Sequence, residues 1–409
     1  MHRIKRNGKF ELEYVIYPIT ICVVLIVVSS FTGLWATEEN PYRSYTLQAC
    51  AWIEGRLDLG ADYPWLELAI YDGKYYVSFP PFPSFVMLPF AMVFGVNTPD
   101  HLISLIFTLM GVIYALRLYK LHSGNLKLAE YYVLFLYFAN GYIFIAMQGW
   151  VWYLAQCMCF TLSLMALYYA STGRGGTALT CWACAVGCRP MIIVYLPLLL
   201  MILVRKWDEM RGINLVRLIQ KKWYWALPTV FIAVIYMMLN YERFGDPFEF
   251  GHNYLPEFLR AEKGQFSLSY IPKNLELLLR LPQGEIGKEA LTYHTFDCMA
   301  FWLIAPMSIV YAIVWMQAVL SRRRVCQMEW VTIPLMLLLH LLIICSHRTL
   351  GGYQFGNRYI VDMLPYVFYG LLRIKPENRR FELLILPLFV MGFSINLIGT
   401  VATYNHWMS

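Results

Sequence analysis

Long uncharged runs recur along this chain of 409 residues, and they constrain its fold more than any other feature. Most of them are long enough to cross about 30 Å of hydrocarbon as a helix. One could hold two helices, and another needs upstream residues to complete it. The runs are 14–35, 102–116, 131–170, 191–204, 223–240, 298–320, 330–346 and 383–404. The sequence therefore predicts an all-α polytopic membrane protein.

Composition agrees with this prediction. Only 14% of the residues are charged and the mean hydropathy is +0.51, whereas about a quarter of a soluble domain is charged. The first apolar run follows a basic N-terminus, as in a secretory signal, but it is long and no convincing small-residue cleavage site follows it. We interpret this run as an uncleaved first helix.

The net charge of +7 has a topological explanation. About half of the 33 Lys and Arg lie in four short segments, 3–9, 205–222, 322–324 and 373–380. The positive-inside rule assigns such loops to the cytoplasm. Two long polar loops, about 37–79 and 241–297, fall on the other side and carry more than half of the 26 Asp and Glu. Nothing in this distribution favours nucleic-acid binding.

With residues 1–13 in the cytoplasm, the chain is predicted to be one integral-membrane domain spanning 1–409, with about eleven crossings (ten to twelve). The sixth is long and broken near Pro190, so it could be two shorter pieces. Arg117, Lys120 and Lys127 fall on the outer side in this arrangement, against the charge rule. The predicted crossings are 14–36, 80–96, 101–119, 128–146, 149–170, 177–204, 223–240, 297–320, 329–346, 354–372 and 381–403.

The two outer loops contain local structure of their own. Asp72-Gly73 stands between "LAIY" and "KYYVSF", a strong signal for a β-hairpin. In the second loop, 270–281 is amphipathic and predicts a short interfacial helix. Pro80 and Pro81 mark the start of the second predicted helix, where proline is tolerated, and Pro89 falls inside that helix.

The first outer loop supplies the candidate general bases, because a carboxylate can deprotonate an acceptor hydroxyl within hydrogen-bond reach. Glu38 and Glu39 stand apart because they follow the first helix directly, at the depth where a lipid-linked substrate presents its head group. For any one of these residues, the alternative is a solvated loop carboxylate. The carboxylates of the loop are Glu38, Glu39, Glu54, Asp58, Asp62, Glu67 and Asp72.

Two arginines lie within or beside apolar runs, where charge is costly and often functional. Arg358 enters an apolar helix, and a guanidinium suits a phosphate. The alternative is an ion pair with Asp362 four residues later. Arg189 lies beside the predicted helix break, where it could line the same cavity or cap a broken helix. No metal or nucleotide motif is present. The carboxylate oxygens of the acidic loop could still bind a divalent cation.

Three segments carry a family resemblance: "ENPYRSYTLQACAWIEGRLDL" (39–59), "YDGKYYVSFPPFPSFVMLPFAMVFG" (71–95) and "LGGYQFGNRYIVDMLPY" (350–366). Together with the layout of helices and loops, they resemble the GT-C superfamily of integral-membrane glycosyltransferases, and are similar to bacterial members of it. These enzymes use polyprenyl-phosphate sugars. The resemblance covers most of the chain, at the level of layout more than of strict motif.

The resemblance implies a transferase of the bacterial cell envelope with its site on the extracytoplasmic face. Active relatives commonly carry an acidic pair after the first helix, and the matching place here reads Glu38-Glu39-Asn40, with Glu where Asp is usual. Glu39 or Glu38 would deprotonate the acceptor, and Arg358 with Arg348 would bind the donor phosphate, in an inverting transfer. The acceptor (a glycan, a lipid or a protein) is not indicated.

Three other functional classes remain as alternatives. A lipid-linked glycan transporter or flippase predicts charges in many helices and similar inverted halves, and neither is evident here. A polymerase-like or ligase-like enzyme predicts its key Arg and His in a late outer loop. A catalytically inactive assembly protein would keep the fold without the chemistry.

Overall fold

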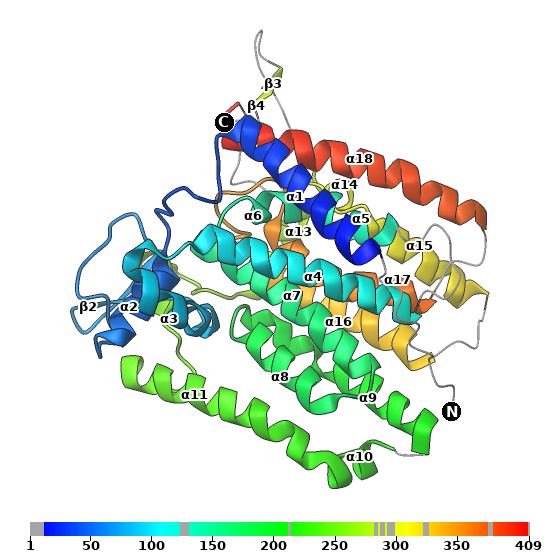
Figure 1. Ribbon diagram of the computed structural model, residues 1–409, viewed down its shortest axis with the longest axis horizontal. Coiled ribbons are helices and arrows are strands. Elements are labelled where there is room, and N and C mark those ends of the chain that lie inside the picture. The colour runs from blue at the N-terminus through cyan, green and yellow to red at the C-terminus, as the bar shows by residue number, and fades with distance from the viewer. Residues whose placement is uncertain are drawn as a thin grey trace.

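The computed structural model describes residues 12–122, 131–211, 214–281, 285–286, 291–292, 299–321, 327–374 and 379–407. Figure 1 shows most of the helices side by side in one bundle, with α2, α3 and a small hairpin gathered at one end. The predicted basic segments 3–9 and 322–324 and Lys127 lie outside the described residues. The predicted helical character is confirmed.

The elements follow one another in this order: α1 Glu13–Thr32, α2 Ser44–Ile53, β1 Leu68–Tyr71, β2 Lys74–Val77, α3 Phe82–Phe94, α4 Asp100–His122, α5 Tyr131–Phe138, α6 Tyr142–Ala146, α7 Val151–Ser171, α8 Gly175–Val186, α9 Leu196–Arg211, α10 Leu215–Lys222, α11 Leu227–Phe244, α12 Pro256–Leu259, α13 Ile271–Leu279, β3 Glu285–Ile286, β4 Leu291–Thr292, α14 Phe301–Ile304, α15 Met307–Leu320, α16 Gln327–Ser346, α17 Leu364–Ile374 and α18 Arg379–Tyr404. Short 3₁₀ helices join several of them, among them η2 Pro190–Tyr195, η3 Trp223–Ala226 and η6 Arg358–Met363.

Among the described residues, seven helical segments are long and apolar enough to cross a membrane, which does not confirm eleven spans. Three further apolar helices, 82–97, 175–186 and 307–320, are shorter. The central helix α7 is the most enclosed of the seven, and the segment 215–244 is the least enclosed. The bundle thus has a buried centre and a long apolar helix at its edge.

Several predicted spans are divided, each for a local reason. Within 128–146, α5 ends at Phe138, because the Asn140 amide donates to the Leu136 carbonyl (2.7 Å) and accepts from the backbone of Tyr142 (2.8 Å). Its first residues, 128–130, lie outside the described part of the chain. Within 177–204, the predicted break near Pro190 is confirmed, since α8 ends at Val186 and α9 begins at Leu196.

The path of the chain between α1 and α4 differs from the prediction. Lys120, near the end of α4, pairs with Glu13, at the start of α1, at 3.2 Å. The two helices therefore run in opposite directions, and the segment between them begins and ends at the same side of the bundle. A single crossing by 80–96 is excluded, so α3 does not cross between them. This correction moves Lys120 to the end of the bundle that holds the start of α1.

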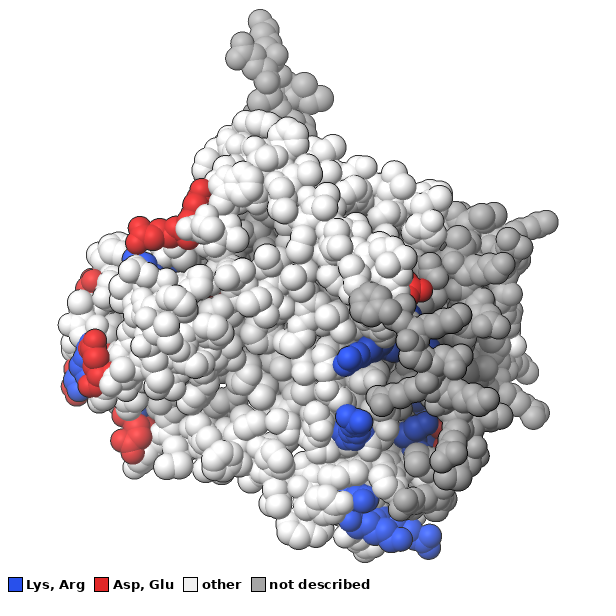
Figure 2. Space-filling model, viewed as in Figure 1, with Lys and Arg blue, Asp and Glu red and all other residues white. Residues whose placement is uncertain are grey.

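The two ends of the bundle differ in charge. In Figure 2, most acidic side chains gather over the end that carries α2, and Lys and Arg gather near the opposite end, with an uncharged surface between them. This separation is the one expected of a chain oriented by the positive-inside rule.

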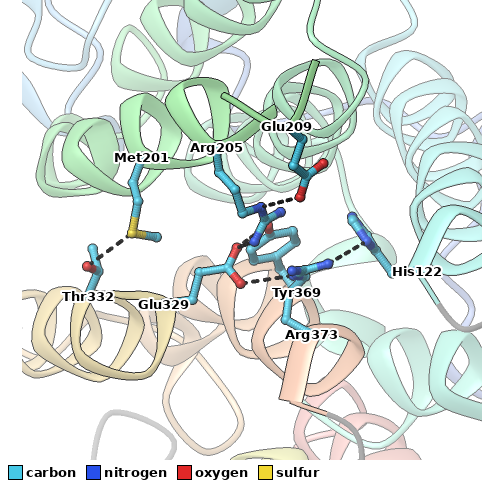
Figure 3. A network of polar contacts seen from close by, with 8 residues as sticks. All are labelled: His122, Met201, Arg205, Glu209, Glu329, Thr332, Tyr369 and Arg373. Atoms are coloured by element: carbon cyan, nitrogen blue, oxygen red, sulfur yellow. Dashed lines mark hydrogen bonds and ion pairs between the residues drawn. The ribbon is translucent and has the colours of Figure 1, made fainter. Parts of the chain in front are cut away.

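A buried ion cluster ties four helices together at the basic end (Figure 3). Glu329 of α16 is 2% exposed. It accepts from Arg373 of α17 at 3.0 Å, from the Tyr369 hydroxyl at 3.0 Å, and from Arg205 of α9. Arg373 also contacts His122 of α4 at 3.3 Å. Arg205 and Arg373 both bind Glu329. The segments that begin at these two residues therefore start at the same end of the bundle, as the sequence predicts.

Replacing Glu329 with Ala should destabilise the protein by roughly 3–5 kcal/mol, because two partly buried guanidinium groups lose their shared carboxylate. Thermal unfolding in detergent micelles measures this. Glu209→Ala is the matched control: its ion pair with Arg205 is longer, at 3.7 Å, and its side chain is 57% exposed. That loss should be about 1 kcal/mol or less. Equal losses in the two variants would contradict a structural role for the cluster.

Candidate active site

A cavity of about 560 Å³ lies where the first polar loop, the break between α8 and α9, and the segments 250–277 and 347–359 meet. Its volume falls within the range of about 300–1,000 Å³ typical of ligand sites. Four cationic side chains line it, Arg189, Lys273, Arg348 and Arg358, with two carboxylates, Glu67 and Glu257. We call it the cationic cavity.

The helix break brings Arg189 to this cavity. After α8 the chain is extended at Arg189 (φ −141°, ψ 101°), and Pro190 opens η2. The carbonyl of Gly187 is thereby free to accept from the backbone of Phe82, at the start of α3, at 3.0 Å. Of the two sequence-based alternatives for Arg189, the structure favours cavity lining, since its side chain forms no capping bond.

Arg358 is a buried cationic residue in the cavity wall. Its side chain is 5% exposed, it forms no ion pair with a described carboxylate, and its Nε has no acceptor. One terminal nitrogen contacts Gln156 Oε1 at 3.4 Å. The guanidinium carbon lies 5.2 Å from the ring centre of Tyr359 and 5.9 Å from that of Trp152. A buried guanidinium with spare donors is suited to an anionic ligand.

The backbone around Arg358 is fixed by amide side chains. Gln354 Oε1 accepts from the Arg358 backbone at 3.0 Å, and Asn357 caps η6 by accepting from Ile360 at 3.1 Å. On the other side, Gln156 of α7 donates to the Arg358 carbonyl at 2.9 Å. Asp362 does not form the ion pair with Arg358 that the sequence offers as the alternative to phosphate binding. It binds Arg189 Nε instead, at 2.9 Å.

Glu67 is the carboxylate that the first loop contributes to the cavity. It directly precedes β1, which pairs antiparallel with β2 from Leu68–Val77 to Tyr71–Lys74, so the hairpin is confirmed. Asp72 and Gly73 have φ values of 48° and 68°, as a two-residue turn of this kind requires. The Ser78 hydroxyl donates to the Glu67 carbonyl at 3.1 Å.

The carboxylate of Glu67 accepts from the Trp152 indole at 3.0 Å. Desolvation by the surrounding protein raises the pKa of Glu67, while the Trp152 hydrogen bond and the charge of Arg358 oppose that rise. The charge of Glu257 raises the same pKa slightly. Glu67 thus lies within the electrostatic reach of both Arg358 and Glu257.

Glu38 and Glu39 are exposed and do not line the cavity. The Glu39 side chain is 81% exposed and pairs with Arg43 at 3.4 Å. The next residue, Asn40, is buried, and its amide donates to Asp100 (2.6 Å) and to the Gly149 carbonyl (2.8 Å). Of the prolines, Pro80 lines the cavity, Pro81 precedes α3, and Pro89 lies inside α3 as predicted.

The second polar loop supplies the opposite wall. Arg348 donates to the Glu257 carbonyl, and its backbone donates to the Gln265 carbonyl at 2.8 Å. Burial raises the pKa of Glu257, against the charge of Arg348. Lys273 lies on α13, which confirms the predicted helix at 270–281. Sequence reasoning treated Lys273 as the polar face of that helix and did not associate it with Arg348.

Two histidines and three phenylalanines complete this wall. His252 contacts the Ser78 carbonyl through Nδ1 at 3.2 Å, and burial lowers its pKa to about 3, helped by His347. Burial also lowers the pKa of His347 to about 4, so both rings are neutral at physiological pH. The phenylalanines of the second loop that contact these rings are Phe250, Phe258 and Phe266, and Phe79 of the first loop also contacts His252. Their separation in the sequence concealed this cluster.

Among the described residues, no group of three or more His, Cys, Asp or Glu side chains is arranged so that it could hold a metal ion.

Comparison with known proteins identifies the fold. The crystal structure of ArnT from Cupriavidus metallidurans bound to undecaprenyl phosphate is similar over 97% of this chain and 78% of that one, with a TM-score of 0.55 and 14% identity. The Archaeoglobus fulgidus oligosaccharyltransferase in the apo form matches over 97% of this chain and 57% of its own, with a TM-score of 0.45 and 11% identity. No family model matches the chain. No curated protein matches it either. The chain therefore shares the fold of the ArnT structure over nearly its whole length.

Proposed function

We propose that this protein is an inverting membrane glycosyltransferase that transfers a sugar from a polyprenyl-phosphate donor to an acceptor hydroxyl. The buried guanidinium of Arg358, which faces the cationic cavity and forms no ion pair with a carboxylate of the described residues, carries the proposal. Such a group is costly to keep in an empty site and is stabilised by a phosphate. The fold shared with ArnT, whose structure holds undecaprenyl phosphate, supports a ligand with a polyprenyl-phosphate group.

In the proposed topology, the basic end of the bundle faces the cytoplasm and the cavity opens on the extracytoplasmic side. Lipid-linked sugars are activated donors that remain available on that side. The proposal assigns eleven crossings to the elements α1, α4, α5 with α6, α7, α8, η2 with α9, α11, α15, α16, η6 with α17, and α18. In this assignment α3 does not cross, and the divided run 177–204 supplies two crossings.

The chemical step uses groups on both sides of the cavity. The acceptor oxygen attacks the anomeric carbon, and the bond from that carbon to the phosphate oxygen breaks on the opposite face, which inverts the configuration. The electron pair leaves with the phosphate, where Arg358 stabilises the added charge. A carboxylate takes the acceptor proton. The sequence assigns this base to Glu39 or Glu38, and the cavity geometry favours Glu67.

The proposed function is tested by a transfer assay in proteoliposomes supplied with a series of polyprenyl-phosphate sugars and candidate glycan, lipid and peptide acceptors. A glycosidic product with inverted configuration is expected. Movement of the lipid-linked sugar across the bilayer without any new glycosidic bond would support a transporter instead. Absence of both, with a well-folded protein, would support an inactive assembly protein.

The orientation makes a separate prediction. In a cysteine-free background, single cysteines at Asp72 and Ser267 should react with an impermeant maleimide added outside intact cells. A cysteine at Lys221 should react only after permeabilisation. Asp72 and Lys221 are exposed, and Ser267 is partly exposed. Labelling of Lys221 but neither outer position in intact cells would reverse the topology and remove the argument for a lipid-linked donor.

A further inference from the structure

Two guanidinium groups share one aromatic ring at the inner wall of the cavity. The guanidinium carbon of Arg189 lies 4.8 Å from the ring centre of Tyr359, and that of Arg358 lies 5.2 Å from it. The two carbons are therefore at most about 10 Å apart, close enough for like charges to repel each other at low effective dielectric. Some feature of the wall must offset this repulsion.

Asp362 provides that offset for only one of the two groups. It is 2% exposed, and one carboxylate oxygen binds Arg189 Nε at 2.9 Å. Its other oxygen accepts from Gln156 at 3.1 Å, and Gln156 in turn contacts Arg358. Gln156 is an uncharged amide, so it fixes the position of Arg358 without balancing its charge. The pair therefore carries about one net positive charge.

Other charges that face this pair act from a greater distance. Glu67 is influenced by Arg358 but forms no ion pair with it, and Arg348 and Glu257 act on each other across the cavity. Within the contacts of the described residues, Asp362 is the carboxylate bonded to the guanidinium pair. The net charge of the pair thus depends on this one side chain.

We infer that Asp362 is a specificity-determining residue that matches the guanidinium pair to a singly charged phosphodiester. The inference rests on the proposed function, because the donor of that reaction carries one negative charge at its phosphate, whereas the departing polyprenyl phosphate carries close to two at neutral pH. A pair with one net charge holds the donor without retaining the product. Asp362 acts through Arg189, so it is a positioning residue and not a catalytic one.

Binding measurements without turnover test this inference. The probes are undecaprenyl phosphate and its methyl phosphodiester, each titrated in detergent onto wild type and variants at neutral pH. In Asp362→Asn, which keeps the side-chain shape, the preference for undecaprenyl phosphate over the diester should rise about tenfold, because the pair gains a net charge. If Asp362 had only a structural role, Asp362→Asn would weaken the binding of both ligands equally and leave the ratio of their affinities unchanged.

Two further variants keep the test decisive if Asp362→Asn folds poorly. Arg189→Gln with Asp362→Asn replaces the ion pair by neutral side chains, so the wild-type ratio should return. Arg189→Gln alone leaves the carboxylate unbalanced, and the preference for undecaprenyl phosphate should fall about tenfold. Equal ratios in all folded variants would overturn the inference alone. A wild type that binds neither probe would overturn the proposed function as well.

Discussion

Replacing Arg358 with Ala should reduce the second-order rate constant of transfer by about 10²- to 10³-fold, with the fold retained. A preorganised donor that stabilises developing charge typically contributes that much. Arg358 forms no ion pair with a described carboxylate, so its removal leaves no orphaned anion. Thermal stability should therefore be unchanged or slightly higher. Steady-state transfer rates and thermal unfolding of the same preparation measure both quantities.

Arg243 offers a matched control. It is also buried, at 2% exposure, and it lies over the ring of Phe244, but it does not line the cavity. Its terminal nitrogens donate to the Val77 carbonyl (3.1 Å) and to Asn240 (2.8 Å). Arg243→Ala should lower stability by about 1–3 kcal/mol, because those acceptors lose their partner, and leave the rate per folded molecule unchanged. The reverse pattern would make Arg358 a structural residue.

Hydropathy predicts most of this fold because the bilayer imposes a minimum length and apolarity on every crossing helix. The hairpin at Asp72-Gly73 and the helix at 270–281 follow from equally local rules. Arg189 and Arg358 attract attention for a related reason, since a charge beside an apolar run is expensive unless it has a use.

Long-range contacts account for what the sequence did not predict. The 80–96 run is as apolar as a crossing helix, and the long-range pairing of Glu13 with Lys120 shows that the chain does not cross there. The same applies to Asp362, which has a local candidate partner four residues away and binds Arg189 instead. Local spacing rules compare only neighbours in the sequence, so they cannot identify a partner that is 173 residues away.

The candidate base illustrates the same limit within a single loop. Seven carboxylates lie between 37 and 79, and adjacency to the first helix singled out Glu38 and Glu39. Which carboxylate lines the cavity depends instead on where the hairpin packs, and a linear pattern does not encode that packing. Glu67 is distinguished by its contact with Trp152, 85 residues further along the chain.

Glu67→Gln should reduce the rate of transfer by about 10²- to 10⁴-fold, the usual contribution of a general base. The amide oxygen of Gln still accepts the Trp152 hydrogen bond, so the wall of the cavity keeps its shape. Glu39→Gln and Glu38→Gln are the controls within the same loop, and each should change the rate less than threefold, because each side chain is exposed outside the cavity lining. If either control lost most of its transfer rate while Glu67→Gln stayed active, the general base would be Glu38 or Glu39, as the sequence indicates.

The pH profile gives an independent test of Glu67. A general base works when deprotonated, so the rate should fall as the pH drops through the pKa of Glu67. Because desolvation raises that pKa, the acidic limb should lie above the range of an ordinary glutamate. Trp152→Phe removes the hydrogen bond that favours the charged form, and should therefore move the limb to still higher pH. A limb that stays in place in Trp152→Phe would mean that another carboxylate accepts the proton.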